Sequence, residues 1–174
     1  MRTAAGSETM VPAPQPAFST PSAGRETLMA RDVLTLGQIR IHSGSVSKEQ
    51  AMKEAADILE AAGAVTSAYF DAMQQREMAV STYMGNELAI PHGTNETKAA
   101  ILDSALSFVR YDGGVDWGGE PVTFVVGIAG KGDEHLEILS QIALLFSEDE
   151  EVAKLKAAQT PEDLYRLLAT VNEA

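Results

Sequence analysis

Apolar side chains recur at helical spacing in several segments of this chain, each bounded by a capping residue or a helix breaker. The longest such segment follows Ser47 and Gln50, which form a capping-box pair, and Gly63 is placed to end it. Its apolar face consists of Ala51, Met52, Ala55, Ala56, Leu59 and Ala62. Thr66 is placed to cap a second helix that runs to Arg76. The pattern therefore predicts two consecutive amphipathic helices.

The C-terminal third carries further helix starts. Residues 147–150 read Ser-Glu-Asp-Glu and predict a second capping box, and Thr160 followed by Pro161 predicts a cap with proline at the first helical position. An apolar stripe from Leu136 to Phe146 predicts another helix before these two.

Two segments have strand character. Residues 104–111 and 122–128 are rich in apolar and β-branched side chains, and the second is apolar almost throughout, as expected for a central strand covered on both faces. The glycines in Asp112-Gly113-Gly114 and in Gly118-Gly119 predict loops. We therefore expect an α/β fold, a single domain with a small mixed β-sheet flanked by helices on both faces.

The first thirty residues differ from the rest of the 174-residue chain, because they hold four of its seven prolines among small side chains. Such a segment buries too little apolar surface to offset its ordering entropy, so we expect residues 1–30 to form a flexible arm and residues 31–171 to form the domain. No apolar stretch has the length of a signal-peptide core or of a membrane span. We expect a cytoplasmic protein without direct membrane insertion.

The formal net charge of −12 falls on residues 31–174, since the charges of the arm cancel. A strongly acidic domain repels nucleic acid and anionic membranes, so neither is an expected partner. The chain has no cysteine, which excludes disulfides, a thiolate nucleophile and cysteine-metal sites. This composition fits a reducing compartment.

One histidine has unusual neighbours. His92 lies between Pro91, which fixes its own φ and favours an extended residue before it, and Gly93, which allows a sharp turn. This frame presents an imidazole from a stiff corner, as a nucleophile or ligand requires, although a turn histidine without a role has the same surroundings. His135 follows a glycine-containing loop in the first turn of a helix, where free amide groups favour an anion, or it is a surface residue.

Several enzyme classes are disfavoured by motifs that the sequence lacks. The loop before His135 lacks the Gly-Lys-Ser/Thr order of a nucleotide-binding P-loop, and the chain contains no Gly-x-Ser-x-Gly elbow. His42, His92 and His135 are the three histidines, and none of them has HExxH or HxH spacing. A metal site is therefore not expected.

A family resemblance joins these features. Residues 83–86, Tyr-Met-Gly-Asn, running into residues 89–94, Ala-Ile-Pro-His-Gly-Thr, resemble the active-site segment of enzyme IIA in the mannitol/fructose branch of the bacterial phosphoenolpyruvate-dependent sugar phosphotransferase system. The resemblance extends to Arg76-Glu77 and to residues 133–136, Asp-Glu-His-Leu, and it covers roughly residues 31–171.

The resemblance implies a phosphoryl relay without metal or nucleotide cofactor. His92 would accept the phosphoryl group on Nε2 from the carrier protein HPr and pass it to enzyme IIB, which makes the chain a phosphotransferase. His135 would bind phosphoryl oxygens, and Arg76 would offset their charge. The resemblance also implies that Gly93, Thr94 and Asn86 support the bound phosphoryl group. Some members carry glutamate at the position of Asn86, so no acidic role is expected there.

The resemblance also bears on the sugar. Residues 125–135 are more similar to mannitol-type members than to fructose-type members, so mannitol is the expected substrate of the transporter. The alternatives are a fructose-type protein, a regulatory relay domain that uses the same phosphohistidine, and a binding module without enzymatic activity.

Overall fold

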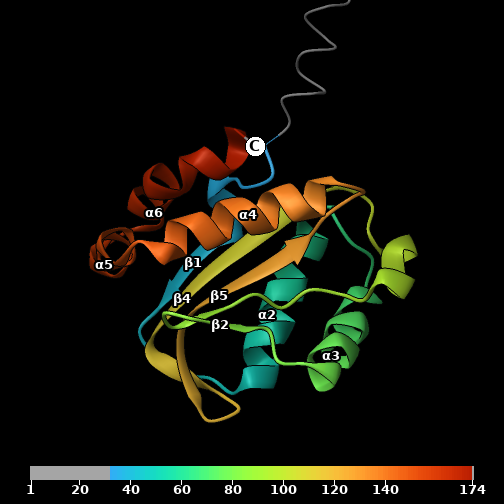
Figure 1. The fold of residues 1–174 in the computed structure, drawn as a ribbon, viewed down its shortest axis with the longest axis horizontal. Helices are drawn as coiled ribbons and strands as arrows, with labels where there is room; N and C mark the ends of the chain where they lie inside the picture. The colour runs from blue at the N-terminus through green and yellow to red at the C-terminus, as the bar shows by residue number, and fades with distance from the viewer. Residues whose placement is uncertain (1–31, 174) are drawn as a thin grey trace, which may run out of the picture. The chain divides into compact units, whose positions relative to one another are not determined.

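A single mixed sheet forms the centre of the domain. The computed structural model describes residues 32–173, apart from the side chains of residues 95 and 173, and the predicted arm of residues 1–30 lies outside this range. The sheet has five strands in the order β1-β4-β5-β3-β2 (Figure 1). Their bounds are β1 Ile39–His42, β2 Tyr83–Gly85, β3 Leu88–Ala89, β4 Ala105–Trp117 and β5 Glu120–Ala129. The pairs β1/β4 and β3/β5 are parallel, whereas β4/β5 and β2/β3 are antiparallel.

Helices cover both faces of the sheet, as predicted (Figure 1). One face is covered by α2 (Lys48–Ala61) and α3 (Tyr69–Ala79), and the other by α4 (Glu134–Ser147), α5 (Asp149–Ala157) and α6 (Pro161–Leu168). Short 3₁₀ segments lie at Leu36–Gln38, Asn95–Ala100 and Ala169–Glu173.

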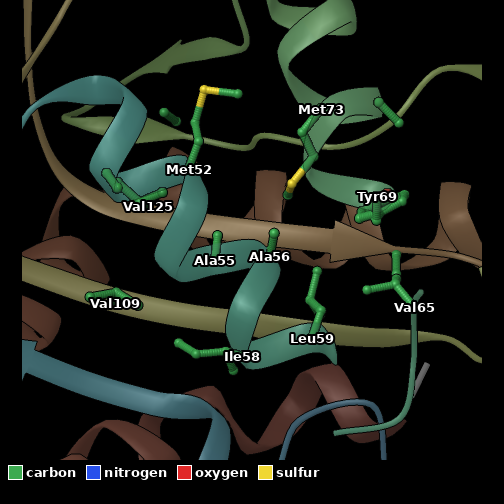
Figure 2. Close-up of a cluster of buried hydrophobic side chains, with 14 of the residues drawn as sticks. Met52, Ala55, Ala56, Ile58, Leu59, Val65, Tyr69, Met73, Val109 and Val125 are labelled. Atoms are coloured by element: carbon green, nitrogen blue, oxygen red, sulfur yellow. The ribbon is translucent and has the colours of Figure 1, made fainter. Parts of the chain in front are cut away.

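The sheet separates two hydrophobic cores. Figure 2 shows the first, in which the small and apolar side chains of α2 pack toward Val109 and Val125 of the sheet. Phe108 and Phe124 point to the opposite face and pack with Phe146 of α4 in the second core. Alternation of side chains along β4 and β5 thus supplies both cores, as an almost wholly apolar central strand requires.

Several predicted helix ends are confirmed. Ser47 and Gln50 exchange both hydrogen bonds of a capping box, and Gly63 follows the end of α2 with φ of 77°. Thr160 accepts a hydrogen bond from the Asp163 amide at 3.1 Å, and Pro161 is the first residue of α6. Each of these caps is made between residues three apart in the sequence, so the local sequence is enough to predict it.

Two predicted caps are wrong. Thr66 does not cap α3: the bridge between Val65 and Ile101 and the hydrogen bond from the Thr66 amide to Ala100 hold this segment outside the helix, which begins at Tyr69 after Ala68. Ser147 is the last residue of α4, and its hydroxyl donates to the Leu144 carbonyl. Burial of Phe146 extends α4 to the residue directly before the α5 N-cap, so the predicted capping box has no place to form.

A predicted loop is also wrong. Residues 112–114 form an irregularity inside β4 rather than a loop, since pairing with β5 resumes at Val115 opposite Val122. Gly113 donates to the Gly44 carbonyl, and a Cβ at Gly113 would lie 2.6 Å from the Gly44 carbonyl carbon. These glycines therefore permit a bulge and a close approach of two backbones.

The helices of this domain are short relative to a lipid bilayer. Within residues 32–173, none is both long and apolar enough to cross a membrane.

Candidate active site

A cleft of about 720 Å³ opens where β3 and β5 end. These two strands are parallel, so their carboxyl ends lie at the same edge of the sheet, the usual position of ligand sites in α/β folds. The cleft lies among the end of β3, the loop after β5, the start of α4, α3 and the 3₁₀ segment. Its lining residues are Tyr69, Arg76, His92, Gly93, Thr94, Glu96, Lys98, Ile101, Gly130, Gly132, His135 and Leu136.

His92 is held in the register of the sheet. Ala89 lies opposite Val125 in the β3/β5 pair, and His92 lies opposite Ile128, three residues further along both strands. Pro91 between them has no N–H to donate, but its carbonyl accepts a hydrogen bond from the Ile128 amide at 3.1 Å. The segment after β3 therefore stays in register with β5 past Pro91, and this register places His92 at the cleft.

The protonation of the His92 ring follows from its hydrogen bond. Nδ1 lies 2.7 Å from the Ile90 carbonyl oxygen, and a carbonyl only accepts, so Nδ1 carries the proton and Nε2 holds the free lone pair. Burial and the positive charge of Arg76 lower the pKa of His92, against the opposing effects of the Ile90 carbonyl and Glu77. The ring is therefore neutral and nucleophilic near pH 7.

Tyr69 fixes the turn after His92. Its hydroxyl donates to the Ile128 carbonyl at 2.6 Å and accepts from the Gly93 amide at 2.9 Å, which links α3, β5 and the His92 turn. Burial raises the Tyr69 pKa to about 12, so the hydroxyl keeps its proton. A Cβ on Gly93 would lie 2.7 Å from a Tyr69 ring carbon. Gly93 is thus required for this close approach, whereas the prediction attributed it to a sharp turn.

His135 reaches the same cleft from α4. Its ring centroid lies 5.3 Å from that of His92, and it occupies the first turn of the helix, as predicted. A Cβ on Gly130 would lie 2.4 Å from the His135 Cα, so only glycine allows the loop to pass this close. Ser104 holds that loop by accepting from the Lys131 amide at 2.9 Å and donating to Glu134. Burial and the nearby His92 lower the pKa of His135.

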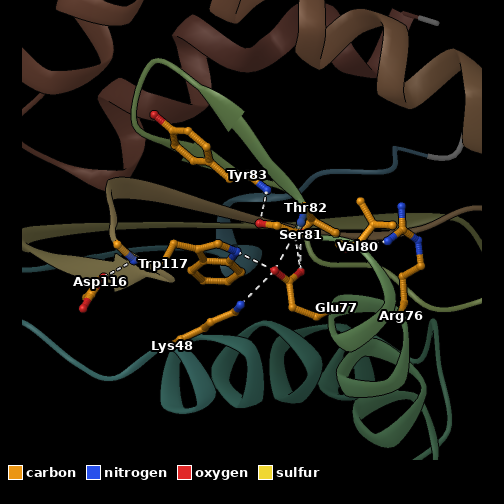
Figure 3. Close-up of polar contacts among 10 residues, drawn as sticks. Lys48, Arg76, Glu77, Val80, Ser81, Thr82, Tyr83, Asp116 and Trp117 are labelled. Atoms are coloured by element: carbon orange, nitrogen blue, oxygen red, sulfur yellow. Dashed lines mark hydrogen bonds and ion pairs between the residues drawn. The ribbon is translucent and has the colours of Figure 1, made fainter.

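Arg76 supplies a cation from the last turn of α3. The residue as a whole is half-buried, and its guanidinium donates from Nη1 to the Val80 carbonyl at 2.7 Å (Figure 3). Among residues 32–173 it forms no ion pair within 4 Å. Its charge is therefore available to an anion in the cleft.

The supporting positions divide into two groups. Gly93 and Thr94 line the cleft, but Asn86 does not. Asn86 occupies the β2/β3 turn with φ of 50°, and its amide donates to the Phe146 carbonyl at 2.6 Å near the end of α4. The structure therefore gives Asn86 a contact that fastens the turn to α4, and does not bring it to His92.

Tyr69 and Lys98 line the cleft, but sequence reasoning assigned neither of them a role in the site. Tyr69 matches the apolar face of its helix, so its pattern predicts only a core position, and no local signal shows that its hydroxyl joins β5 to the His92 turn. Lys98 belongs to a polar segment between elements and reaches the cleft only through the fold. Each depends on contacts between residues distant in sequence, which periodicity does not report.

The arrangement suits reversible covalent capture of an anionic electrophile. A neutral imidazole with a fixed tautomer supplies the nucleophile, and a guanidinium and a second imidazole line the same cleft. The site therefore combines a nucleophile with groups that stabilise negative charge.

Comparisons with known proteins agree with this geometry. Residues 32–171 match the family model described as phosphoenolpyruvate-dependent sugar phosphotransferase system, EIIA 2. The mannitol-specific phosphotransferase enzyme IIA component of Halalkalibacterium halodurans is 44% identical over 145 residues, which cover 83% of this chain and 100% of that protein. The protein of the same description from Staphylococcus aureus is 50% identical over 118 residues, which cover 68% of this chain and 82% of its own length.

A solved structure extends the agreement to the fold. The complex of enzyme IIAMTL and phosphorylated enzyme IIBMTL from Escherichia coli contains a chain with a TM-score of 0.73 and 28% identity, covering 79% of this chain and 97% of that chain. The chain therefore belongs to the EIIA 2 family of the phosphoenolpyruvate-dependent sugar phosphotransferase system.

Proposed function

We propose that His92 accepts a phosphoryl group on Nε2 from phosphorylated HPr and donates it to enzyme IIB during mannitol uptake. The observation that carries this proposal is the Nδ1–Ile90 hydrogen bond of 2.7 Å, which leaves Nε2 as the free nitrogen of a cleft histidine. Membership of the family makes the chain a phosphotransferase component. The residue assignment, the donor and the sugar belong to the proposal.

The proposed transfer is a nucleophilic displacement at the phosphorus atom. The His92 Nε2 lone pair forms the new N–P bond, the bond from phosphorus to the donor's imidazole nitrogen breaks, and its electron pair returns to that nitrogen. The Nδ1 proton stays in place, and the Ile90 carbonyl stabilises the partial positive charge that the phosphorylated ring acquires. Positioning and charge stabilisation carry most of such a transfer, because the transition state is loose.

Arg76 and His135 would act on the phosphoryl oxygens. The Arg76 guanidinium already projects into the cleft with its charge unpaired within residues 32–173. His135 would gain a hydrogen bond, and its lowered pKa would rise once His92 carries a phosphoryl dianion, since an opposite charge favours the protonated ring. Gly93 and Thr94 would border the bound group.

The relatives support the choice of sugar and partner. Both curated relatives are named mannitol-specific, and the Escherichia coli complex pairs enzyme IIAMTL with phosphorylated enzyme IIBMTL. We therefore propose mannitol enzyme IIB as the acceptor. Phosphorylated HPr is the donor that the family resemblance implies. The relay would operate in the cytoplasm. A fructose-type or regulatory protein is not favoured by these relatives.

Reconstitution tests the proposal. Phosphoenolpyruvate, enzyme I and HPr should label the wild-type chain, and mannitol enzyme IIB should remove the label. His92→Ala should abolish labelling. His42→Ala should leave it unchanged, because His42 of β1 pairs with Glu54 of α2 and does not line the cleft. Labelling of His92→Ala would overturn the residue assignment. Faster discharge by fructose enzyme IIB than by mannitol enzyme IIB would overturn the sugar.

A further inference from the structure

Glu77 is an unusual buried carboxylate beside the site, with 7% of its surface exposed. It lies next to Arg76 in the last turn of α3, and its oxygens accept hydrogen bonds from three neighbouring residues (Figure 3). The Thr82 amide donates at 3.1 and 3.2 Å and the Thr82 hydroxyl donates as well. The Trp117 indole donates at 2.8 Å and the Lys48 ammonium pairs at 3.0 Å.

This set of donors keeps the carboxylate ionised. Burial alone would raise the pKa of Glu77, but the hydrogen bonds from Thr82, Lys48 and Trp117 outweigh it and hold the pKa below its ordinary value. The Lys48 ammonium, which also lies 5.2 Å from the centre of the Trp117 ring, supplies the compensating charge. Lys48 rather than the adjacent Arg76 is therefore the counter-ion of Glu77.

The bond from Thr82 to Glu77 replaces a bond of the sheet. Tyr83 lies opposite Ala89 in the antiparallel β2/β3 pair, so Thr82 lies opposite Ile90. The Ile90 amide donates to the Thr82 carbonyl at 3.1 Å, and in a regular antiparallel pair the Thr82 amide would return a bond to the Ile90 carbonyl. Here that amide points to Glu77, and the Ile90 carbonyl instead accepts from His92 Nδ1.

Glu77 also holds the segment that orients Arg76. The Val80 carbonyl, which accepts the Arg76 Nη1 hydrogen bond, lies two residues before Thr82. Both the amide and the hydroxyl of Thr82 donate hydrogen bonds to Glu77. These bonds restrain residues 78–81, which lie between Glu77 and Thr82 and include Val80. Figure 3 shows this stretch between the Glu77 carboxylate and the Arg76 guanidinium.

We propose that Glu77 is a positioning residue for phosphoryl transfer: it withdraws the Thr82 amide from Ile90, so that the Ile90 carbonyl fixes the His92 tautomer, and it holds the Val80 carbonyl that orients Arg76. This inference rests on the proposed role of His92. Glu77 touches neither the phosphoryl group nor the reacting nitrogen. Its positioning effect passes through two backbone carbonyls to the nucleophile and to the cation, in addition to the direct effect of its charge, which raises the pKa of His92.

The test combines ¹⁵N NMR of the histidine rings with transfer kinetics. Glu77→Met removes every acceptor while preserving side-chain length, and Glu77→Gln retains one acceptor oxygen. Glu54→Met is the matched control, because Glu54 is a partly buried carboxylate on α2 that pairs with His42 and does not line the cleft. Urea unfolding of each variant measures the loss of stability separately.

In the wild type, the His92 nitrogen shifts should be those of a single Nδ1–H tautomer. In Glu77→Met the freed Thr82 amide should compete for the Ile90 carbonyl, giving a mixture of tautomers and about tenfold slower acceptance from phosphorylated HPr. Glu77→Gln should change both readouts in the same direction by less, and Glu54→Met should change neither. Glu77→Met placed in an Arg76→Met background should slow transfer less than it does alone.

The outcomes separate this inference from the proposed function. A wild-type tautomer pattern in whichever Glu77 variant folds would overturn the positioning role, even if transfer slows, since lost stability alone would then explain the slowing. Equal slowing by Glu77→Met with and without Arg76 would overturn its action through Arg76. Failure of wild-type His92 to become labelled would instead overturn the proposed function, with the NMR result still interpretable.

Discussion

Removal of the Tyr69 hydroxyl is the sharpest perturbation of the His92 turn that leaves every cleft charge in place. Tyr69→Phe keeps the buried ring but deletes the oxygen that joins the Gly93 amide to the Ile128 carbonyl. Gly93 directly follows His92, and Ile128 lies opposite His92 in the sheet. The substitution therefore releases the Gly93 amide from α3 and frees the Ile128 carbonyl without altering the nucleophile, while the hydrogen bond from the Ile128 amide to the Pro91 carbonyl remains.

The expected magnitude follows from the two hydrogen bonds. Each intramolecular hydrogen bond contributes about 1 kcal/mol net, and a buried partner left unsatisfied raises the cost of losing it. Tyr69→Phe should therefore lower the free energy of unfolding by about 2 kcal/mol. The looser turn should slow acceptance of the phosphoryl group about tenfold, because small misplacements of a reacting atom are costly.

Urea unfolding and rapid-quench labelling from phosphorylated HPr measure these two effects. Tyr111→Phe is the matched control, since Tyr111 is an equally buried tyrosine of the same core whose hydroxyl lies beside Glu54 and away from the cleft. The control should retain the wild-type rate of labelling. If Tyr69→Phe accepts the phosphoryl group as fast as Tyr111→Phe, the two hydrogen bonds of the Tyr69 hydroxyl do not position His92.

Three further predictions concern charge at the site. Arg76→Ala should slow labelling on the order of a hundredfold, and Arg76→Lys should recover only part of the lost rate. Equal labelling rates for Arg76→Ala and the wild type in the same rapid-quench assay would contradict the role of Arg76 in offsetting phosphoryl charge. His135→Ala should still accept the group but discharge it to enzyme IIB more slowly; stable label on His135 itself would remove it from this role. The acid limb of the labelling rate should have its midpoint below pH 6.5, because burial and Arg76 lower the His92 pKa, and Arg76→Ala should move that midpoint upward in a pH–rate series.

The same shift has a consequence for stability. An unfolded chain takes up a proton on His92 near pH 6.5, before the folded chain does, because the folded pKa is the lower one. Stability contributed by the neutral ring is therefore present above pH 6.5 and is lost as the pH falls through the folded pKa. His135 shifts in the same direction and adds to this dependence.

Local sequence signals succeeded where a single segment determines its own structure. The Ser47 capping box and the Thr160-Pro161 start contain all of their hydrogen-bonding groups within four residues. Thr66 and Ser147 carry the same chemistry but fail as caps, because the segment of Thr66 pairs with residues 100–101 outside the helix and α4 extends through Ser147. Tertiary contacts therefore decide between equivalent local signals.

The candidate site shows the same limit. The Pro-His-Gly frame and the loop before His135 identified both histidines, and the family resemblance added Arg76. The sequence did not reveal why Gly93 is glycine, since the reason is a Tyr69 ring brought by another helix. It assigned Asn86 to the phosphoryl group, but the fold turns that side chain toward Phe146.

The central claim is that Nε2 of His92 is the atom that carries the phosphoryl group. The most direct measurement is ³¹P and ¹⁵N NMR of the chain phosphorylated through HPr, with phosphopeptide mapping of the same sample. We expect one phosphohistidine, at His92, with phosphorus coupled to Nε2 and the Nδ1 proton retained. Phosphorus bonded to Nδ1 of His92, or carried by His135 or any other residue, would contradict it.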